Sequence, residues 1–161
     1  MSLRILLRRA HGPAGISATL LIALFALATL IAELSGDAAA VVAVKRAILI
    51  GLVVLIPTLA LAGGSGAAVA GPSPKGVAAR KLARMKIVAP VGLLVLTPAT
   101  ILLAGRAETG RFDALFYAVQ ALELAAGGFN LSLLVANLLD GLRLAGRLPR
   151  NDGPKRRTRD S

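Results

Sequence analysis

Cysteine and tryptophan are absent from this 161-residue chain, and histidine occurs once, as His11. The lack of cysteine excludes disulfides, thiolate nucleophiles, iron–sulfur clusters and Cys-bound zinc. One histidine provides no His pair within a chain, and a small haem protein usually buries several. We therefore predict no cofactor and no metal. Haem bound through His11 is disfavoured, and a surface or capping role for His11 is the simpler interpretation.

Acidic residues are scarce, with 8 Asp and Glu against 19 Lys and Arg, for a net charge of +11. In a soluble protein this charge would suggest nucleic acid, but aromatic residues make up only 3% of the chain and no aromatic platform accompanies the basic residues. Motifs of hydrolases, kinases, dinucleotide-binding proteins and metalloenzymes are also missing. The sequence thus predicts a non-enzymatic protein that does not bind nucleic acid.

Apolar residues are abundant instead: they form 56% of the chain and gather in four long runs. Runs of about 20 apolar residues are long enough to cross a membrane as helices. We place the spans at about 16–34, 47–69, 87–104 and 114–140. The predicted fold is all-α, an integral membrane four-helix bundle with an up-down-up-down topology.

We divide the chain into a basic interfacial N-terminus over residues 1–12, one transmembrane domain over 13–147 and a basic disordered tail over 148–161. Residues 1–12 mix Leu with Arg, which suits either a short interfacial helix or a partly ordered terminus. Pro13 suits the first turn of a new helix. The run 16–34 resembles a secretory signal, but it is long and three further spans follow, so we expect it to remain uncleaved.

The positive charges predict the orientation. Of the 19 Lys and Arg residues, 15 fall in the N-terminus, the loop near residues 71–86 and the C-terminal tail. Because cytoplasmic loops are enriched in Lys and Arg, both termini are expected in the cytoplasm, in a multi-pass protein of the inner membrane. The same residues are expected to attract anionic lipids.

Two prolines interrupt the second and third spans near the middle of the bilayer. Pro57 and Pro98 each remove one helical hydrogen bond, and Thr58 and Thr97 lie next to them. We predict that the two prolines break their helices beside these hydroxyl groups. The polar side chains of the fourth span could meet the breaks near the middle of the bilayer.

Small residues recur in steps of four along the second span, at Gly63, Ala67 and Gly71. Such spacing lets two helix backbones approach closely. We predict that these residues, together with Gly127 of the fourth span, pack helices together within the chain or between copies of it.

The fourth span has a polar stripe. Gln120, Glu123, Asn130 and Asn137, taken together with Gly127 and Leu134, occur in alternating steps of three and four, and these steps keep side chains on one helix face. Polar groups in hydrocarbon are costly unless they face protein or trapped water. Two interpretations stay open: helix packing or oligomerisation, and a site for an ion, a proton or a small ligand.

Glu123 is the most informative residue of the stripe, about one third of the way across the membrane from the periplasmic side. It is expected either to be neutral or to pair with a cation, and Lys45 or Arg46 could reach it from the second span. A hydrogen bond to Gln120 or to a neighbouring backbone group is the alternative. At the end of the span, Asp140 and Arg143 are three residues apart and are expected to pair.

These observations favour a small bacterial-type inner-membrane protein that acts as a homo-oligomer or as an accessory subunit of a membrane complex. A small proton- or cation-coupled transport protein with a site at Glu123 is the alternative. A redox subunit linked to haem or quinone is weaker, because ligands are lacking.

Overall fold

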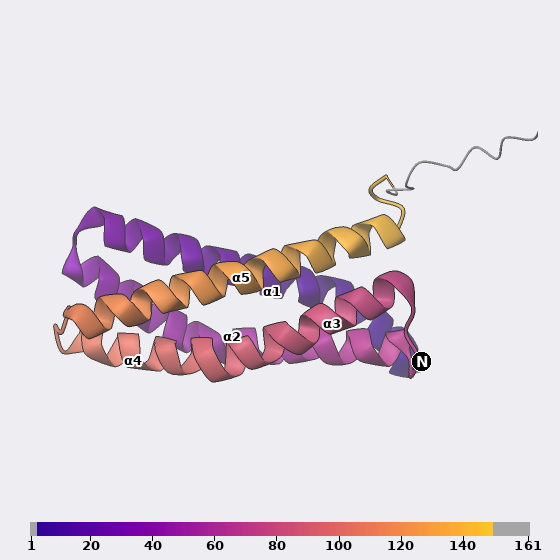
Figure 1. Ribbon diagram of the computed structural model, residues 1–161, viewed down its shortest axis with the longest axis horizontal. Helices are drawn as coiled ribbons and strands as arrows, with labels where there is room; N and C mark the ends of the chain where they lie inside the picture. Colours follow the sequence, from indigo (N-terminus) through magenta and orange to yellow (C-terminus); the bar gives the residue numbers. More distant parts are fainter. Residues whose placement is uncertain (1–2, 150–161) are drawn as a thin grey trace, which may run out of the picture.

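Four long, roughly antiparallel helical rods make up the part of the chain that the computed structural model describes, residues 3–149 (Figure 1). The first two rods and the last are single helices, and the third is continuous through three segments. In chain order the elements are α1 (Leu3–Ser35), α2 (Ala38–Ala70), α3 (Gly76–Pro90), the π-helical segment η1 (Val91–Leu96), α4 (Thr97–Glu108) and α5 (Ala114–Leu144).

The four rods are long and apolar enough to cross a membrane, with 31 to 33 residues each. About 20 helical residues cross the hydrocarbon core, at about 1.5 Å per residue, so each rod extends beyond it. The chain is therefore a multi-pass membrane protein by length and composition. The start of α1 and the end of α5 lie at the same end of the rods (Figure 1), which we call the terminal end; the opposite end is the loop end.

The first helix differs from its prediction, because it begins at Leu3 and continues through Pro13 without a new start. A proline inside a helix removes one backbone hydrogen bond. A contact with α2 holds the preceding turn: His11 Nδ1 lies 3.0 Å from the carbonyl oxygen of Ala62. The basic segment is thus the first part of α1 and not a separate element. Most of the predicted disordered tail, residues 150–161, lies outside the described residues.

Aspartate caps begin the two helices that follow the loop-end turns. The Asp37 carboxylate accepts a hydrogen bond from the backbone N–H of Ala39 at 2.9 Å, and Asp113 accepts one from Phe116 at 3.1 Å. Such caps satisfy N–H groups that have no partner within the helix. Because each cap follows directly on a short turn, it fixes where the chain re-enters the bundle.

The third rod changes its hydrogen-bond pattern between two prolines. Residues Val91–Leu96 form a π-helix, and the N–H of Thr97 bonds to the carbonyl of Gly92, five residues earlier. The Thr97 hydroxyl donates to the same carbonyl at 3.0 Å. Pro98 has no N–H to continue an α-helical pattern, so a wider turn accommodates it without ending the rod.

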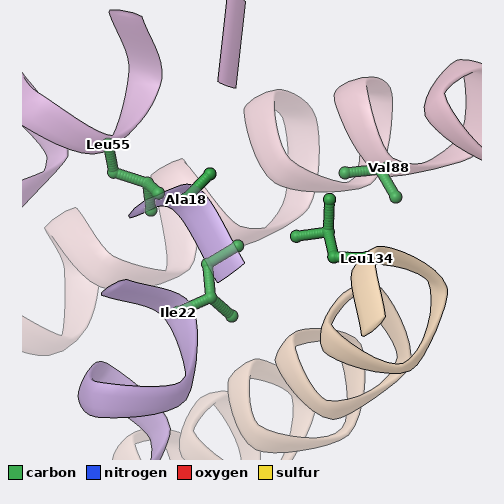
Figure 2. Close-up of a cluster of buried hydrophobic side chains, with 5 residues drawn as sticks. All are labelled: Ala18, Ile22, Leu55, Val88 and Leu134. Atoms are coloured by element: carbon green, nitrogen blue, oxygen red, sulfur yellow. The ribbon is translucent and has the colours of Figure 1, made fainter. Parts of the chain in front are cut away.

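Two apolar clusters fill the interior. The one toward the terminal end joins α1, α2, α3 and α5, and Figure 2 shows its side chains directed toward one another. The other lies at the loop end and joins α1, α2, α4 and α5. Their buried members are Ala18, Ile22, Leu55, Val88 and Leu134 in the first, and Ala32, Val41, Leu103, Ala107 and Phe116 in the second. Every rod therefore contributes to both ends of the core.

The predicted small-residue stripe of α2 does not lie as one face against a neighbouring helix. Gly63 approaches the side chain of Met85, since a Cβ there would lie 3.4 Å from Met85 Cε, whereas Ala67 is exposed. Gly71 instead ends α2 with a φ of 76°, a value that favours glycine. The closest approach to a glycine of α2 occurs at Gly51, where an added Cβ would collide with the Phe25 ring of α1.

This contact predicts the effect of adding one methyl group. Gly51→Ala should destabilise the bundle by about 1–3 kcal/mol, because the Phe25 ring must move out of its packed position. Gly128→Ala on α5 is the matched control, since a Cβ there meets nothing within 4 Å. Thermal unfolding in detergent should show a lower midpoint for Gly51→Ala alone. Equal midpoints for the two variants would contradict the close packing of α1 on α2.

Candidate functional site

A buried ion pair lies at the centre of the polar face of α5. Lys45 Nζ of α2 is 2.5 Å from Glu123 Oε2, and the two side chains are only 1% and 12% exposed. The Thr100 hydroxyl of α4 donates a hydrogen bond of 2.8 Å to Glu123 Oε1. Both carboxylate oxygens are therefore bonded to other helices of the same chain.

Lys45 on α2 and Glu123 on α5 lie at a similar distance from the loop end. Lys45 follows the first residue of α2, Ala38, by seven positions, which puts its backbone about 11 Å from the helix start. Glu123 lies nine positions after Ala114, where α5 begins at the same end of the rods. The pair is thus nearer the loop end than the terminal end. Of the two cations considered from the sequence, Lys45 is the one that reaches Glu123.

A small cavity of about 70 Å³ lies beside the pair. It is bounded by residues of α1, α2, η1, α4 and α5, nearly all of them apolar; the polar exceptions are Thr29, Thr100 and Glu123. Gly127 forms part of the wall, and a Cβ there would meet nothing within 4 Å. The volume corresponds to about two water molecules at roughly 30 Å³ each, so the space is too small for a larger ligand as it stands.

The proline-associated groups do not converge on Glu123. Pro57 and Pro98 are exposed, and neither they nor Thr58 and Thr97 line the cavity. The Thr58 hydroxyl donates to the carbonyl of Val54 in its own helix at 2.7 Å. Hydroxyl groups next to the prolines thus bond within their own rods.

The two asparagines of the stripe bond to the third rod. Asn130 is fully buried, and its amide donates to the Val88 carbonyl oxygen at 3.1 Å. The Asn137 amide donates to the Lys81 carbonyl at 3.2 Å, while its oxygen accepts from Arg84 Nη1 at 3.1 Å. Asparagine side chains therefore join α5 to α3 at two levels.

An ion-pair network closes the same face at the terminal end. Asp140 Oδ2 lies 2.7 Å from Arg84 Nη1 of α3, and Asp140 Oδ1 lies 3.5 Å from Arg143 Nη1 of its own helix. The pair with Arg143 matches the spacing in the sequence. The shorter pair with Arg84 crosses between helices, and it was not predicted.

Gln120 stands apart from the other members of the stripe. Its side chain is 4% exposed, yet neither Nε2 nor Oε1 has a hydrogen-bond partner among the described residues. It does not bond to Glu123, whose two carboxylate oxygens accept from Lys45 and Thr100. The structure thus brings Glu123, Asn130 and Asn137 into interhelical bonds and leaves Gln120 buried beside them.

Two partners in these contacts were missed from the sequence. Thr100 was not among the predicted site residues, although it precedes Leu103, Ala104 and Ala107 by three, four and seven residues and so shares their buried helix face. Arg84 was counted only as a positive charge of the loop. No sequence signal places it against α5, because that contact depends on which helices are neighbours.

Within residues 3–149 no group of three or more His, Asp or Glu side chains could hold a metal ion. Comparisons with protein-family models, with curated proteins and with solved structures found no match to this chain. The site must therefore be interpreted from its own contacts.

Breaking the ion pair tests its role in stability. Lys45→Met or Glu123→Met alone should lower the free energy of unfolding by about 3–5 kcal/mol, because each leaves an uncompensated charge in the apolar interior. The double variant should recover most of that loss, since it removes both charges. Equilibrium unfolding in mixed micelles measures the three values. A double variant as unstable as the sum of the single variants would show that the two side chains do not interact.

Asp113, outside the spans, gives a pH dependence. The hydrogen bond from the Phe116 N–H, aided by Arg106, holds the pKa of its carboxyl below the ordinary 3.8. Its contribution to stability is therefore complete above that value and is lost as the pH falls through the lowered pKa. Asp113→Asn keeps a capping oxygen but does not titrate. Thermal unfolding should show a smaller loss of stability on acidification for Asp113→Asn than for the wild type; parallel losses would contradict this.

Proposed function

We propose that this chain is a small non-enzymatic protein of the bacterial inner membrane that works as a homo-oligomer or as an accessory subunit of a membrane complex. Its four rods form the unit that packs, and both termini face the cytoplasm. Four apolar helices of membrane-spanning length support the placement, and the Lys and Arg distribution supports the orientation.

One observation carries the choice between packing and transport: both oxygens of Glu123 are bonded to other helices of the chain. A transport site needs a carboxylate that can exchange its partner for an ion or a proton. Here the partner is Lys45, an ammonium group tethered to α2 and buried with it. The cavity beside the pair has mainly apolar walls, so it offers an entering ion few oxygen ligands.

The outer surface supports a packing role. Large apolar side chains are exposed on every rod, as expected for contact with lipid, and they include Leu20, Leu24, Val53, Leu94 and Leu122. On α2 the exposed face also has Ala60, Gly64 and Ala68 in steps of four. Small residues at that spacing let a second helix approach closely in a membrane.

This proposal predicts a specific assembly. Native mass measurement in mild detergent should give a multiple of the 16.4 kDa chain. Gly64→Leu should reduce the assembly, because the larger side chain blocks close approach at α2. Ala125→Leu, on an exposed position of α5, is the matched control and should leave the mass unchanged.

Two results would contradict the proposal. A strictly monomeric mass in detergent and in lipid nanodiscs, with no other membrane subunit bound, would remove the packing role. Ion or proton flux into proteoliposomes that Glu123→Gln abolishes would favour the transport alternative instead.

A further inference from the structure

The polar network at the terminal end contains one cation, Lys81, that forms no ion pair among the described residues. Asp140 is the carboxylate of this network, and each of its oxygens pairs with one arginine, Oδ2 with Arg84 and Oδ1 with Arg143. Lys81 lies close enough for the charge of Asp140 to act on it, but the two do not form an ion pair within 4.0 Å. Among the described residues, the Lys81 ammonium has neither an ion pair nor a hydrogen bond.

Contacts with α5 hold this lysine in a defined position. The Asn137 amide donates to the Lys81 backbone carbonyl at 3.2 Å. One turn further along α5, Lys81 Nζ lies 3.0 Å from the point where a Cβ on Gly141 would be. The ammonium of this half-buried lysine therefore lies against the backbone of α5 at Gly141.

The surroundings of Lys81 are positive. Arg80, Arg84 and Arg143 all act on Asp140 from close by, so this end has four cations around one carboxylate. His11 of α1 also lies within reach of the Lys81 charge, but its Nδ1 is already bonded to the Ala62 carbonyl. A net excess of positive charge, with one ammonium unpaired, favours an anion as the missing partner.

We propose that Lys81, at the junction of α3 and α5, binds the phosphate of an anionic lipid headgroup. Lysine binds phosphate as a compact point charge, and basic residues beside a membrane attract anionic lipids. Lys81 lies six residues before Ile87, where the apolar part of the third span begins, which is about 9 Å and matches the headgroup layer. The site depends on the membrane placement but not on oligomerisation, so the two proposals can fail separately.

Thermal unfolding in detergent tests the site, with phosphatidylglycerol or phosphatidylcholine added as the probe. Phosphatidylglycerol should raise the midpoint of the wild type more than phosphatidylcholine does. Lys81→Gln should lose at least half of this difference. Lys86→Gln, the matched control, makes the same charge change at an exposed position of the same helix and should keep it.

Gly141→Leu provides a second test that leaves every charge in place. The added side chain would fill the space of the ammonium and displace it, so the variant should lose the lipid-specific difference as Lys81→Gln does. The full difference in both variants, or an equal loss in Lys86→Gln, would overturn the proposal.

A phosphate group can come from a lipid headgroup or from free phosphate in solution. A parallel titration with inorganic phosphate distinguishes these two ligands. A phosphatidylglycerol effect that Lys81→Gln removes, with no stabilisation by inorganic phosphate, assigns the site to a lipid headgroup. A stabilisation that Lys81→Gln abolishes, without any effect of phosphatidylglycerol, assigns it to free phosphate and overturns the lipid proposal.

Discussion

The contact on which the bundle most depends is the ion pair of Lys45 and Glu123. Neither charge is tolerable alone in an apolar interior, and the attraction between them compensates only when the geometry is close. With a separation of 2.5 Å and a second contact to Glu123 from Thr100, the pair joins α2, α4 and α5 at one depth. This contact fixes the orientation of α5 about its own axis, because turning Glu123 away would leave Lys45 buried without a partner.

The rest of the polar face extends the same constraint along α5. In a membrane, lipid tails are as apolar as leucine, so apolar side chains alone give little reason for one helix arrangement over another. Asn130 and Asn137 each bond to a backbone carbonyl of α3, and Asp140 bonds to Arg84 of the same helix. Sliding or rotating α5 against α3 would break several of these bonds together. The polar groups thus select one arrangement of the helices, which the burial of apolar side chains does not do.

Much of the architecture followed from the sequence, because four apolar runs of this length have few alternatives in a chain of this size. The polar stripe was also identified, since steps of three and four define a helix face. Which groups the stripe would meet was not accessible. The partner of Glu123 depends on which helices are neighbours, and Thr100 and Arg84 become partners only when the third rod lies beside α5. The continuous α1 was missed because the rule for Pro13 is local, while the contact of His11 with α2 is not.

Gln120 and the π-helical turn show where local rules stop. Gln120 was predicted as part of a polar seam and lies on that face, but its amide is left without a partner among the described residues. Pro98 was predicted to break the third span, yet the rod continues through a wider turn. The neighbours of Gln120 come from other helices, whose arrangement a single sequence does not contain. The wider turn before Pro98 is a local accommodation of the proline within its own rod.

The central claim is that Glu123 is bound directly by Lys45 and is not available to a ligand. Solid-state NMR in bilayers can measure the distance between the two groups, through the coupling between labelled Lys45 Nζ and the labelled Glu123 carboxyl carbon. A direct pair is expected, with the nitrogen and a carboxylate oxygen within about 4 Å, and it should persist when sodium, potassium or pH near neutrality is varied. A longer separation, or a coupling that disappears when one of these ions is added, would contradict it.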